Sequence, residues 1–101
     1  MLSFNKAVWE ATRKIPKGKV STYKKIAEII VRPRAYRAVG NALNKNPYAP
    51  KVPCHRVVCS DGSLGGFALG INKKIKLLRS EGVTVIHNKV KPLDKFLYDK
   101  K

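Results

Sequence analysis

Apolar residues recur at helical spacing near the start of the chain. They predict a first helix over about 4–13, capped by Ser3, because five of them follow the i, i+3, i+4, i+7 rhythm of one buried face: Phe4, Ala7, Val8, Ala11 and Ile15. A Pro-Lys-Gly turn then interrupts the pattern. A second helix is predicted over about 23–31, with Ser21 or Thr22 as its cap and these inward positions: Ile26, Ala27, Ile29 and Ile30.

A third helix is predicted over about 34–44, because Arg32 precedes a proline, is pushed out of the helical region and ends the second helix. Its apolar face comprises Ala35, Ala38, Val39, Ala42 and Leu43. Its opposite face comprises Arg34, Arg37, Asn41 and Lys45. Two helices joined by a tight break, the second with arginine and small residues outward, are typical of a helix-turn-helix. An ordinary helical hairpin with a solvated basic face would show the same pattern.

The second half of the chain is less regular. HRVVC at 55–59 predicts a short strand, SDGS a turn and LGGFALG a glycine-rich loop. A last helix is predicted from a capping Asn72 to Gly82, and VTVI predicts an edge strand after it. We expect a mainly α domain with a small β element over 1–85, winged-helix-like and containing the helix-turn-helix. A basic C-terminal tail at 86–101, with room for a short helical piece, is expected to follow.

Charge changes this picture. The chain of 101 residues has 22 Lys and Arg against 6 Asp and Glu, a net charge of +16. Internal ion pairs cannot absorb such a surplus, so it faces outward and favours a nucleic acid as partner over a merely solvated cationic surface. No apolar run approaches the roughly 20 residues of a membrane span, and the first residues do not resemble a signal peptide. We therefore expect a cytoplasmic protein with reduced thiols and no membrane contact.

The two cysteines lie in the stretch VPCHRVVC, at 52–59. The spacing C-H-x3-C matches no common zinc site, and His87 lies in a dissimilar segment, so neither a metal nor a cofactor is expected. A Cys54–Cys59 disulfide is disfavoured by the reducing compartment. Two inert buried thiols are one interpretation that remains.

The other interpretation makes Cys54 a nucleophile. Pro53 fixes the backbone before it, and His55 and Arg56 follow it in a strongly cationic protein, where positive potential favours the thiolate. Neighbours on a strand face opposite sides, so His55 needs a water bridge or an irregular backbone to reach the sulfur. A reactive cysteine in a DNA-binding chain suggests chemistry on the nucleic acid itself.

Four co-linear motifs carry a resemblance to a known family: IPKGKVSTYKKIA, RAVGNALNKNP, VPCHRVV and LLRSEG. In this order and spacing, over about 4–85, they resemble the DNA-binding and active-site domain of the O6-alkylguanine-DNA alkyltransferases. The resemblance implies repair of guanine alkylated on its exocyclic oxygen, by transfer of the alkyl group to the protein's own cysteine. Each molecule then works once, without a cofactor. The implied partner is double-stranded DNA containing O6-alkylguanine, bound by a monomer.

The resemblance also implies roles around the cysteine. Cys54 is the implied acceptor, His55 takes the thiol proton through a water, and Glu81 orients that histidine. Tyr23 helps to rotate the nucleotide and hydrogen-bonds the base. Asn46 braces the active-site turn.

Further implied roles concern DNA and the base pocket. The third helix is implied to lie in the minor groove, with Arg37 entering the base stack in place of the flipped guanine. Outward residues of that helix are expected to contact DNA: Arg34, Ala38, Gly40 and Asn41. Gly40 costs about 1 kcal/mol in mid-helix and serves either packing or the close approach of a phosphate or sugar. Pocket residues are expected to be Val57, Phe67 and Ala68.

Some features depart from the family pattern. The resemblance includes no counterpart of the N-terminal domain that fuller members carry, and Phe67 and Ala68 stand where some relatives have tyrosine and serine. A short sister group of damage sensors binds the lesion but has tryptophan at the cysteine position, and Cys54 separates this chain from it. The alternatives to a transferase are such a non-transferring sensor and a generic winged-helix DNA binder whose cysteines only fill the core.

Overall fold

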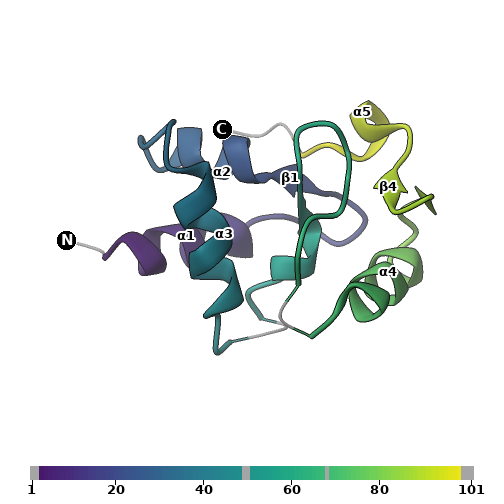
Figure 1. The fold of residues 1–101 in the computed structure, drawn as a ribbon, viewed down its shortest axis with the longest axis horizontal. Helices are drawn as coiled ribbons and strands as arrows, with labels where there is room; N and C mark the ends of the chain where they lie inside the picture. The colour runs from purple at the N-terminus through teal and green to yellow at the C-terminus, as the bar shows by residue number, and fades with distance from the viewer. Residues whose placement is uncertain (1–2, 49–50, 68, 99–101) are drawn as a thin grey trace.

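Three helices gather at one end of the molecule, and a fourth helix lies with a small hairpin at the other (Figure 1). The computed structural model describes residues 3–48, 51–67 and 69–98. Its helices are α1 Phe4–Arg13, α2 Tyr23–Ile29, α3 Tyr36–Asn44, α4 Ile71–Ser80, α5 Leu93–Phe96 and the 3-10 helix η1 Cys54–Arg56. Its strands are β1 Ser21–Thr22, β2 Val57–Val58, β3 Val85–Ile86 and β4 Lys89–Val90. The chain is mainly helical with small sheets, as the sequence predicts.

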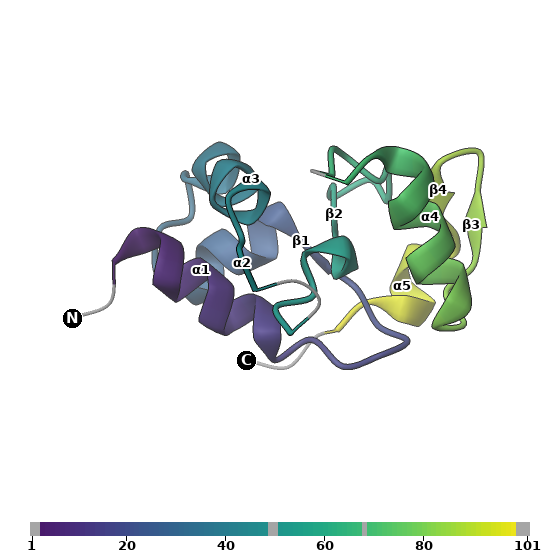
Figure 2. The same ribbon diagram turned by 90° about the horizontal axis from the view of Figure 1, so that it is seen from below.

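The parallel pair of β1 and β2 stands between two apolar cores. Val57 belongs to the core formed by α1, α2 and α3, which we call the helical core; it includes Val8, Ile15, Ile26 and Val39. Val58 belongs to the second core, which includes Leu64, Leu78, Val90 and Phe96. Neighbouring residues of a strand face opposite sides, so β2 supplies both cores. Figure 2 shows α1, α2 and α3 on one side of this strand pair and α4, β3 and β4 on the other.

Local capping explains where the first two helices begin. The Ser3 hydroxyl accepts a hydrogen bond from the Lys6 N–H at 3.2 Å, as expected. The hydroxyl of Thr22, not that of Ser21, accepts from the Lys25 N–H at 3.0 Å. Each cap satisfies one of the N–H groups that a helix start leaves without an intrahelical partner.

The break between α2 and α3 comes earlier than the sequence predicts. α2 ends at Ile29, and Val31 adopts a left-handed φ of 61°. The Arg32 N–H then bonds the Ala27 carbonyl at 2.8 Å, a closing bond typical of a helix end with a left-handed residue. α3 begins at Tyr36 because residues 32–35 form a turn.

Two positions predicted to face inward do not. Ile29 is 38% exposed because α2 has reached its last turn there. Ala38 is exposed, while the buried residues of α3 are Val39, Ala42 and Leu43. The inward face of α3 is therefore narrower than the predicted one, and Ala38 belongs to the outer surface.

The strand predicted at 55–59 is wrong over its first half. Residues 54–56 form η1 instead, because the Arg56 N–H bonds the Pro53 carbonyl at 2.9 Å and the Val57 N–H bonds the Cys54 carbonyl. The predicted Asn72 cap is also wrong. α4 begins after Gly70, whose φ of 95° favours glycine, and the Lys74 N–H bonds its carbonyl at 3.2 Å. Gly82 closes α4 with a φ of 87°, as predicted.

The segment expected as a basic tail packs against the rest of the chain. β3 and β4 form an antiparallel hairpin, so the expected boundary at 85 falls inside it. Val90 and Phe96 are buried in the second core. The Val20 N–H bonds the Phe96 carbonyl at 2.8 Å, and the Tyr98 N–H bonds the Val20 carbonyl at 2.7 Å.

None of the helices in the described part of the chain has the length and apolar character needed to cross a membrane.

Candidate active site

Cys54 lies at the first residue of η1, on the boundary between the two cores. Its side chain is 8% exposed and packs in the helical core. Its N–H bonds the Val52 carbonyl at 2.9 Å, and the Asn46 side-chain amide donates to that same carbonyl at 2.9 Å. The side-chain oxygen of Asn46, Oδ1, also accepts from the Tyr48 N–H at 2.8 Å. Asn46 thus ties together the segment that leads into the cysteine.

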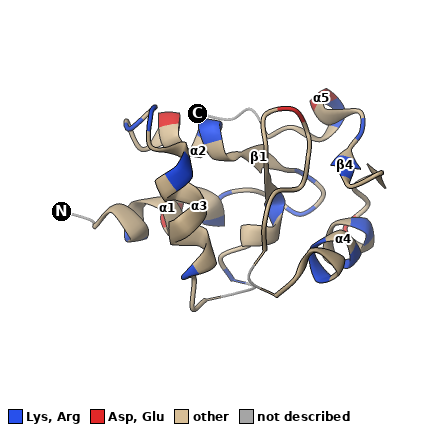
Figure 3. Ribbon diagram, viewed as in Figure 1, with Lys and Arg blue, Asp and Glu red and all other residues tan. Residues whose placement is uncertain are grey.

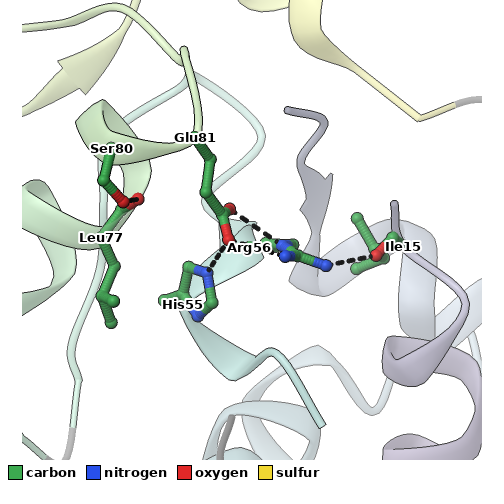
Figure 4. A network of polar contacts seen from close by, with 6 residues as sticks. All are labelled: Ile15, His55, Arg56, Leu77, Ser80 and Glu81. Atoms are coloured by element: carbon green, nitrogen blue, oxygen red, sulfur yellow. Dashed lines mark hydrogen bonds and ion pairs between the residues drawn. The ribbon is translucent and has the colours of Figure 1, made fainter. Parts of the chain in front are cut away.

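His55 and Arg56 both point at Glu81 from η1 (Figure 4). The two basic residues share one carboxylate because η1 is a tight turn and not a strand, on which neighbours would face opposite sides. Arg56 binds Glu81 through two hydrogen bonds, Nε to Oε1 at 2.9 Å and Nη2 to Oε2 at 2.6 Å. Its Nη1 also donates to the Ile15 carbonyl at 2.8 Å, so Arg56 joins α4 to the segment after α1.

The His55 ring is almost fully buried, with Nε2 at 3.1 Å from Glu81 Oε2. The two atoms are in close polar contact, although the alignment falls short of a well-formed hydrogen bond. Burial lowers the pKa of His55 below its ordinary 6.5, and the neighbouring Glu81 only partly offsets this. For Glu81, burial favours the neutral form, but the hydrogen bonds from Arg56 and the contact with His55 outweigh it and lower the pKa. At neutral pH the pair is therefore a neutral imidazole beside a carboxylate.

Lys74 is a fully buried lysine at the centre of the site. Its ammonium donates to the carbonyls of Val57 at 2.7 Å, Leu64 at 2.5 Å and Gly66 at 3.2 Å, so it fixes β2 to the glycine-rich loop. It also lies 3.4 Å from the Tyr23 hydroxyl. Burial lowers the pKa of Lys74 to about 8, and the electrostatic influence of Cys54 and Cys59 acts in the opposite direction.

Tyr23 opens α2 and places its hydroxyl between Lys74 and the loop, 3.5 Å from the Gly66 carbonyl. Burial raises its pKa to about 12, so the phenol keeps its proton and remains a hydrogen-bond donor. Gly65 passes close to this hydroxyl with a φ of +69°. A side chain there would place its Cβ 2.9 Å from the Tyr23 oxygen and 3.4 Å from Cys59 Sγ. Only glycine fits this point of the loop.

Comparison with known proteins assigns the chain to a family. Residues 3–83 match the family described as 6-O-methylguanine DNA methyltransferase, DNA binding domain. The chain belongs to this family. A methylated-DNA–protein-cysteine methyltransferase of Methanosarcina barkeri is 55% identical over 78 residues, 77% of this chain and 49% of that protein. The chain thus spans about half the length of the curated relatives it matches.

Two solved structures give the spatial comparison for this methyltransferase family. OGT of Mycobacterium tuberculosis in complex with DNA superposes with a TM-score of 0.77 at 46% identity, over 80% of this chain and 50% of that one. S. pombe Atl1, in complex with damaged DNA containing O6-carboxymethylguanine, gives a TM-score of 0.88 at 30% identity, over 99% of this chain and all of that one. Both similarities extend well beyond the cysteine motif.

The structure of this methyltransferase-family chain brings most of the expected catalytic residues together. His55 and Glu81 are in contact, Tyr23 meets the glycine-rich loop after β2, and Asn46 reaches the segment before the cysteine. Phe67 is half-buried against the helical core. Ala68 lies outside the described residues. The Val57 side chain is fully buried in the helical core, and its carbonyl is the group that reaches Lys74.

The residues expected to contact DNA lie on one outer surface of α3. Arg34 precedes the helix, and Arg37, Ala38 and Asn41 lie on it; all four are exposed. Gly40 is half-buried, and a Cβ there would lie 3.8 Å from the Tyr23 ring, which is ordinary contact. Packing therefore does not require glycine at 40, and close approach of DNA there stays a prediction. Basic residues are spread over both ends of the molecule (Figure 3).

Two members of the site escaped sequence reasoning. Arg56 was noted only as a source of positive potential, although it holds Glu81 with two hydrogen bonds. Lys74 was not considered, although it lies four residues before Leu78 and seven before Glu81, on the inward face of α4. That spacing was the available indication. The described residues contain no cluster of three or more metal-ligating His, Cys, Asp or Glu, and both cysteines are free thiols.

Proposed function

We propose that this chain repairs DNA directly, by moving the alkyl group of an O6-alkylguanine to Cys54 in a single turnover. One observation carries the proposal: the residue after this cysteine is a buried histidine that faces an ionised Glu81. A neutral imidazole can accept a thiol proton, and the carboxylate stabilises the imidazolium that forms. The family match and the methyltransferase relatives support the same reading.

The reaction begins with the thiol proton. His55 turns Nε2 toward Glu81, so Nδ1 is the nitrogen that takes the proton of Cys54, through a water. The thiolate then attacks the alkyl carbon. The new S–C bond forms as the C–O6 bond breaks, and the electron pair leaves with guanine. The thioether product has no easy reversal, so one protein accepts one alkyl group.

Tyr23 and Lys74 are placed to help the leaving group. As the departing guanine gathers negative charge, the protonated Tyr23 hydroxyl donates a hydrogen bond to it. The Lys74 ammonium, 3.4 Å from that hydroxyl, stabilises the charge that Tyr23 then shares. Lys74 also holds the loop that carries Gly65 and Gly66 at its three carbonyl contacts, and so keeps the base pocket in shape.

The DNA is engaged, in this proposal, by a helix-turn-helix of α2 and α3 in a winged-helix-like domain. A guanine inside a duplex hides its O6 atom, so the nucleotide must be extruded at a cost of a few kcal/mol. Arg37 fills the gap from the exposed surface of α3, and Ala38 and Gly40 allow that surface to approach the minor groove closely. One chain holds every group named, which supports action as a monomer.

A damage sensor that binds alkylated DNA without transfer is the second candidate. S. pombe Atl1, solved in complex with damaged DNA, matches 99% of this chain, and this similarity favours a role in binding lesions. Cys54 argues against a sensor, because a sensor needs no nucleophile beside a histidine base.

The test is incubation with duplex DNA carrying labelled O6-methylguanine, followed by mass spectrometry. We expect one methyl group on the peptide with Cys54, none on Cys59, and no turnover beyond one per protein. The Cys54→Ser variant is the control: it should bind the lesion and stay unlabelled. Tight lesion binding by the unchanged chain with no label on protein would establish the sensor instead, and label on Cys59 would refute the assignment of the nucleophile.

A further inference from the structure

A cavity of about 320 Å³ opens between the outer side of α1 and the segment that leads into η1. Its volume lies at the lower end of ordinary ligand pockets. It shares no residue with the His55–Glu81 contact or with the exposed surface of α3. The residues that matter in its lining are Lys6, Trp9, Glu10 and Arg13 of α1, with Tyr48 and Lys51 opposite.

Two aromatic rings form the apolar part of this cavity. The Trp9 and Tyr48 centroids are 5.6 Å apart, with the ring planes at 79°. In such an edge-to-face pair, the ring that offers its edge keeps both of its faces clear of its partner. Trp9 is fixed by a hydrogen bond from its indole N–H to the Ala42 carbonyl at 2.8 Å. Tyr48 is 53% exposed, so solvent-facing aromatic surface is present for a planar ring to stack on.

The charged part of the cavity favours an anion. Lys6, Arg13 and Lys51 contribute three cations against the single carboxylate of Glu10. That carboxylate is already paired with Arg13, Oε2 to Nη2 at 2.9 Å, and both side chains are about half exposed. A stacking surface beside surplus positive charge suits a planar base joined to a phosphate. Proteins that hold single-stranded nucleic acid combine the same two features.

We propose that this cavity is a second nucleic-acid contact, which binds an unpaired nucleotide of single-stranded DNA by stacking its base on Tyr48 and pairing its phosphate with Lys51 and Lys6. The contact needs no lesion and no reaction at Cys54, so it stands apart from the proposed transfer. It allows the protein to bind single-stranded DNA in addition to the duplex contact proposed for α3. The open, polar rim suits a strand that passes through better than an enclosed small molecule.

Trp9 makes the test direct, because it is the only tryptophan of the chain. Undamaged oligothymidylate should quench its fluorescence saturably, and thymidine monophosphate should bind far more weakly. Tyr48→Ala should weaken binding of the oligonucleotide by about fivefold or more. Tyr48→Phe should leave that affinity unchanged, because stacking uses the ring and not the hydroxyl. The backbone hydrogen bonds of Tyr48 survive both changes.

Charge variants supply the second readout. Lys51→Ala should weaken binding and reduce the salt slope by about 0.7, while Glu10→Gln should tighten binding because it removes the opposing carboxylate. Lys91→Ala, an exposed lysine beyond β4, removes the same charge elsewhere and should change little. Equal losses in the Lys51 and Lys91 variants would reduce the effect to net charge and overturn the proposal. The proposal would also be overturned if Arg37→Ala abolished the quenching while Tyr48→Ala left it unchanged. It would likewise be overturned if thymidine monophosphate bound as tightly as oligothymidylate.

Discussion

Glu81 occupies a position that is unfavourable for a negative charge on a helix. It caps the C-terminal end of α4, where the helix dipole disfavours a negative charge. Two hydrogen bonds from Arg56 and the contact with His55 supply the compensation. The carboxylate therefore both joins parts of the fold and adjusts the basicity of the histidine. A test of its role needs a readout that separates these two effects.

The pH profile of single-turnover transfer provides that readout. His55 acts as base only when neutral, and its pKa is lowered, so the rate should hold as pH falls past 6.5 and decline only below it. Glu81→Gln removes a group that raises the pKa of His55, so it should move the decline to still lower pH and slow transfer by about a hundredfold. Glu28→Gln, on the outer side of α2, is the matched control. A slower variant with an unmoved profile and weaker DNA binding would mean that Glu81 only supports the fold.

At the scale of elements, two helices end in the same way on different residues. α4 closes with Gly82 at a φ of 87°, its N–H bonded to the Arg79 carbonyl at 3.1 Å. α2 closes with Val31 at a φ of 61°, its N–H bonded to the Glu28 carbonyl at 3.0 Å. A left-handed conformation costs a residue with a Cβ roughly 1–2 kcal/mol, and a β-branched side chain is the least suited to it. Val31 is also 74% exposed, so little packing offsets the strain.

Exchanging these residues should have opposite effects on stability. Val31→Gly removes the strain but gives the unfolded chain more freedom, so we expect a net gain of about 1 kcal/mol in the free energy of unfolding. Gly82→Val should lose about as much or more. Urea unfolding followed by circular dichroism measures both. If Val31→Gly were clearly less stable than the parent, Val31 would have to make a packing contact that its exposure does not indicate.

The same elements mark how far sequence reasoning reaches. Periodicity located α1, α2 and α3, and the Ser3 and Thr22 hydroxyls marked where α1 and α2 begin, because apolar spacing and caps act locally; the break between α2 and α3 was less well predicted. The 3-10 helix η1 was not predicted, because its hydrogen bonds form where the chain passes from the helical core to the second core and depend on tertiary packing. The roles of Cys54, His55 and Glu81 follow from a motif and stay predictions, although the structure does bring His55 and Glu81 into contact. Lys74 was missed because its partners are backbone carbonyls, which leave no trace in the sequence.

At the scale of the whole molecule, we expect DNA docking and alkyl transfer to use different surfaces. Arg37→Ala should slow transfer on duplex DNA at least tenfold more than on free O6-methylguanine, because only the duplex requires a base to be extruded. Single-turnover kinetics on both substrates measures this. Arg34→Ala should instead weaken duplex binding with or without a lesion and reduce the salt slope by about one. An equal loss on both substrates would show that Arg37 supports the pocket or the fold.

The boundary between the two cores also limits what can be taken apart. Cys54 and His55 belong to η1, whereas Glu81, which contacts His55, and Lys74, which binds the Val57 carbonyl, both come from α4. Arg56 connects the two cores, because its Nε donates to Glu81 and its Nη1 donates to the Ile15 carbonyl. We expect a fragment of α1, α2 and α3 to keep the exposed surface of α3 and to lose the proposed transfer. Building the proposed reaction into another protein would therefore require η1, α4 and their Arg56–Glu81 contact, not the cysteine motif alone.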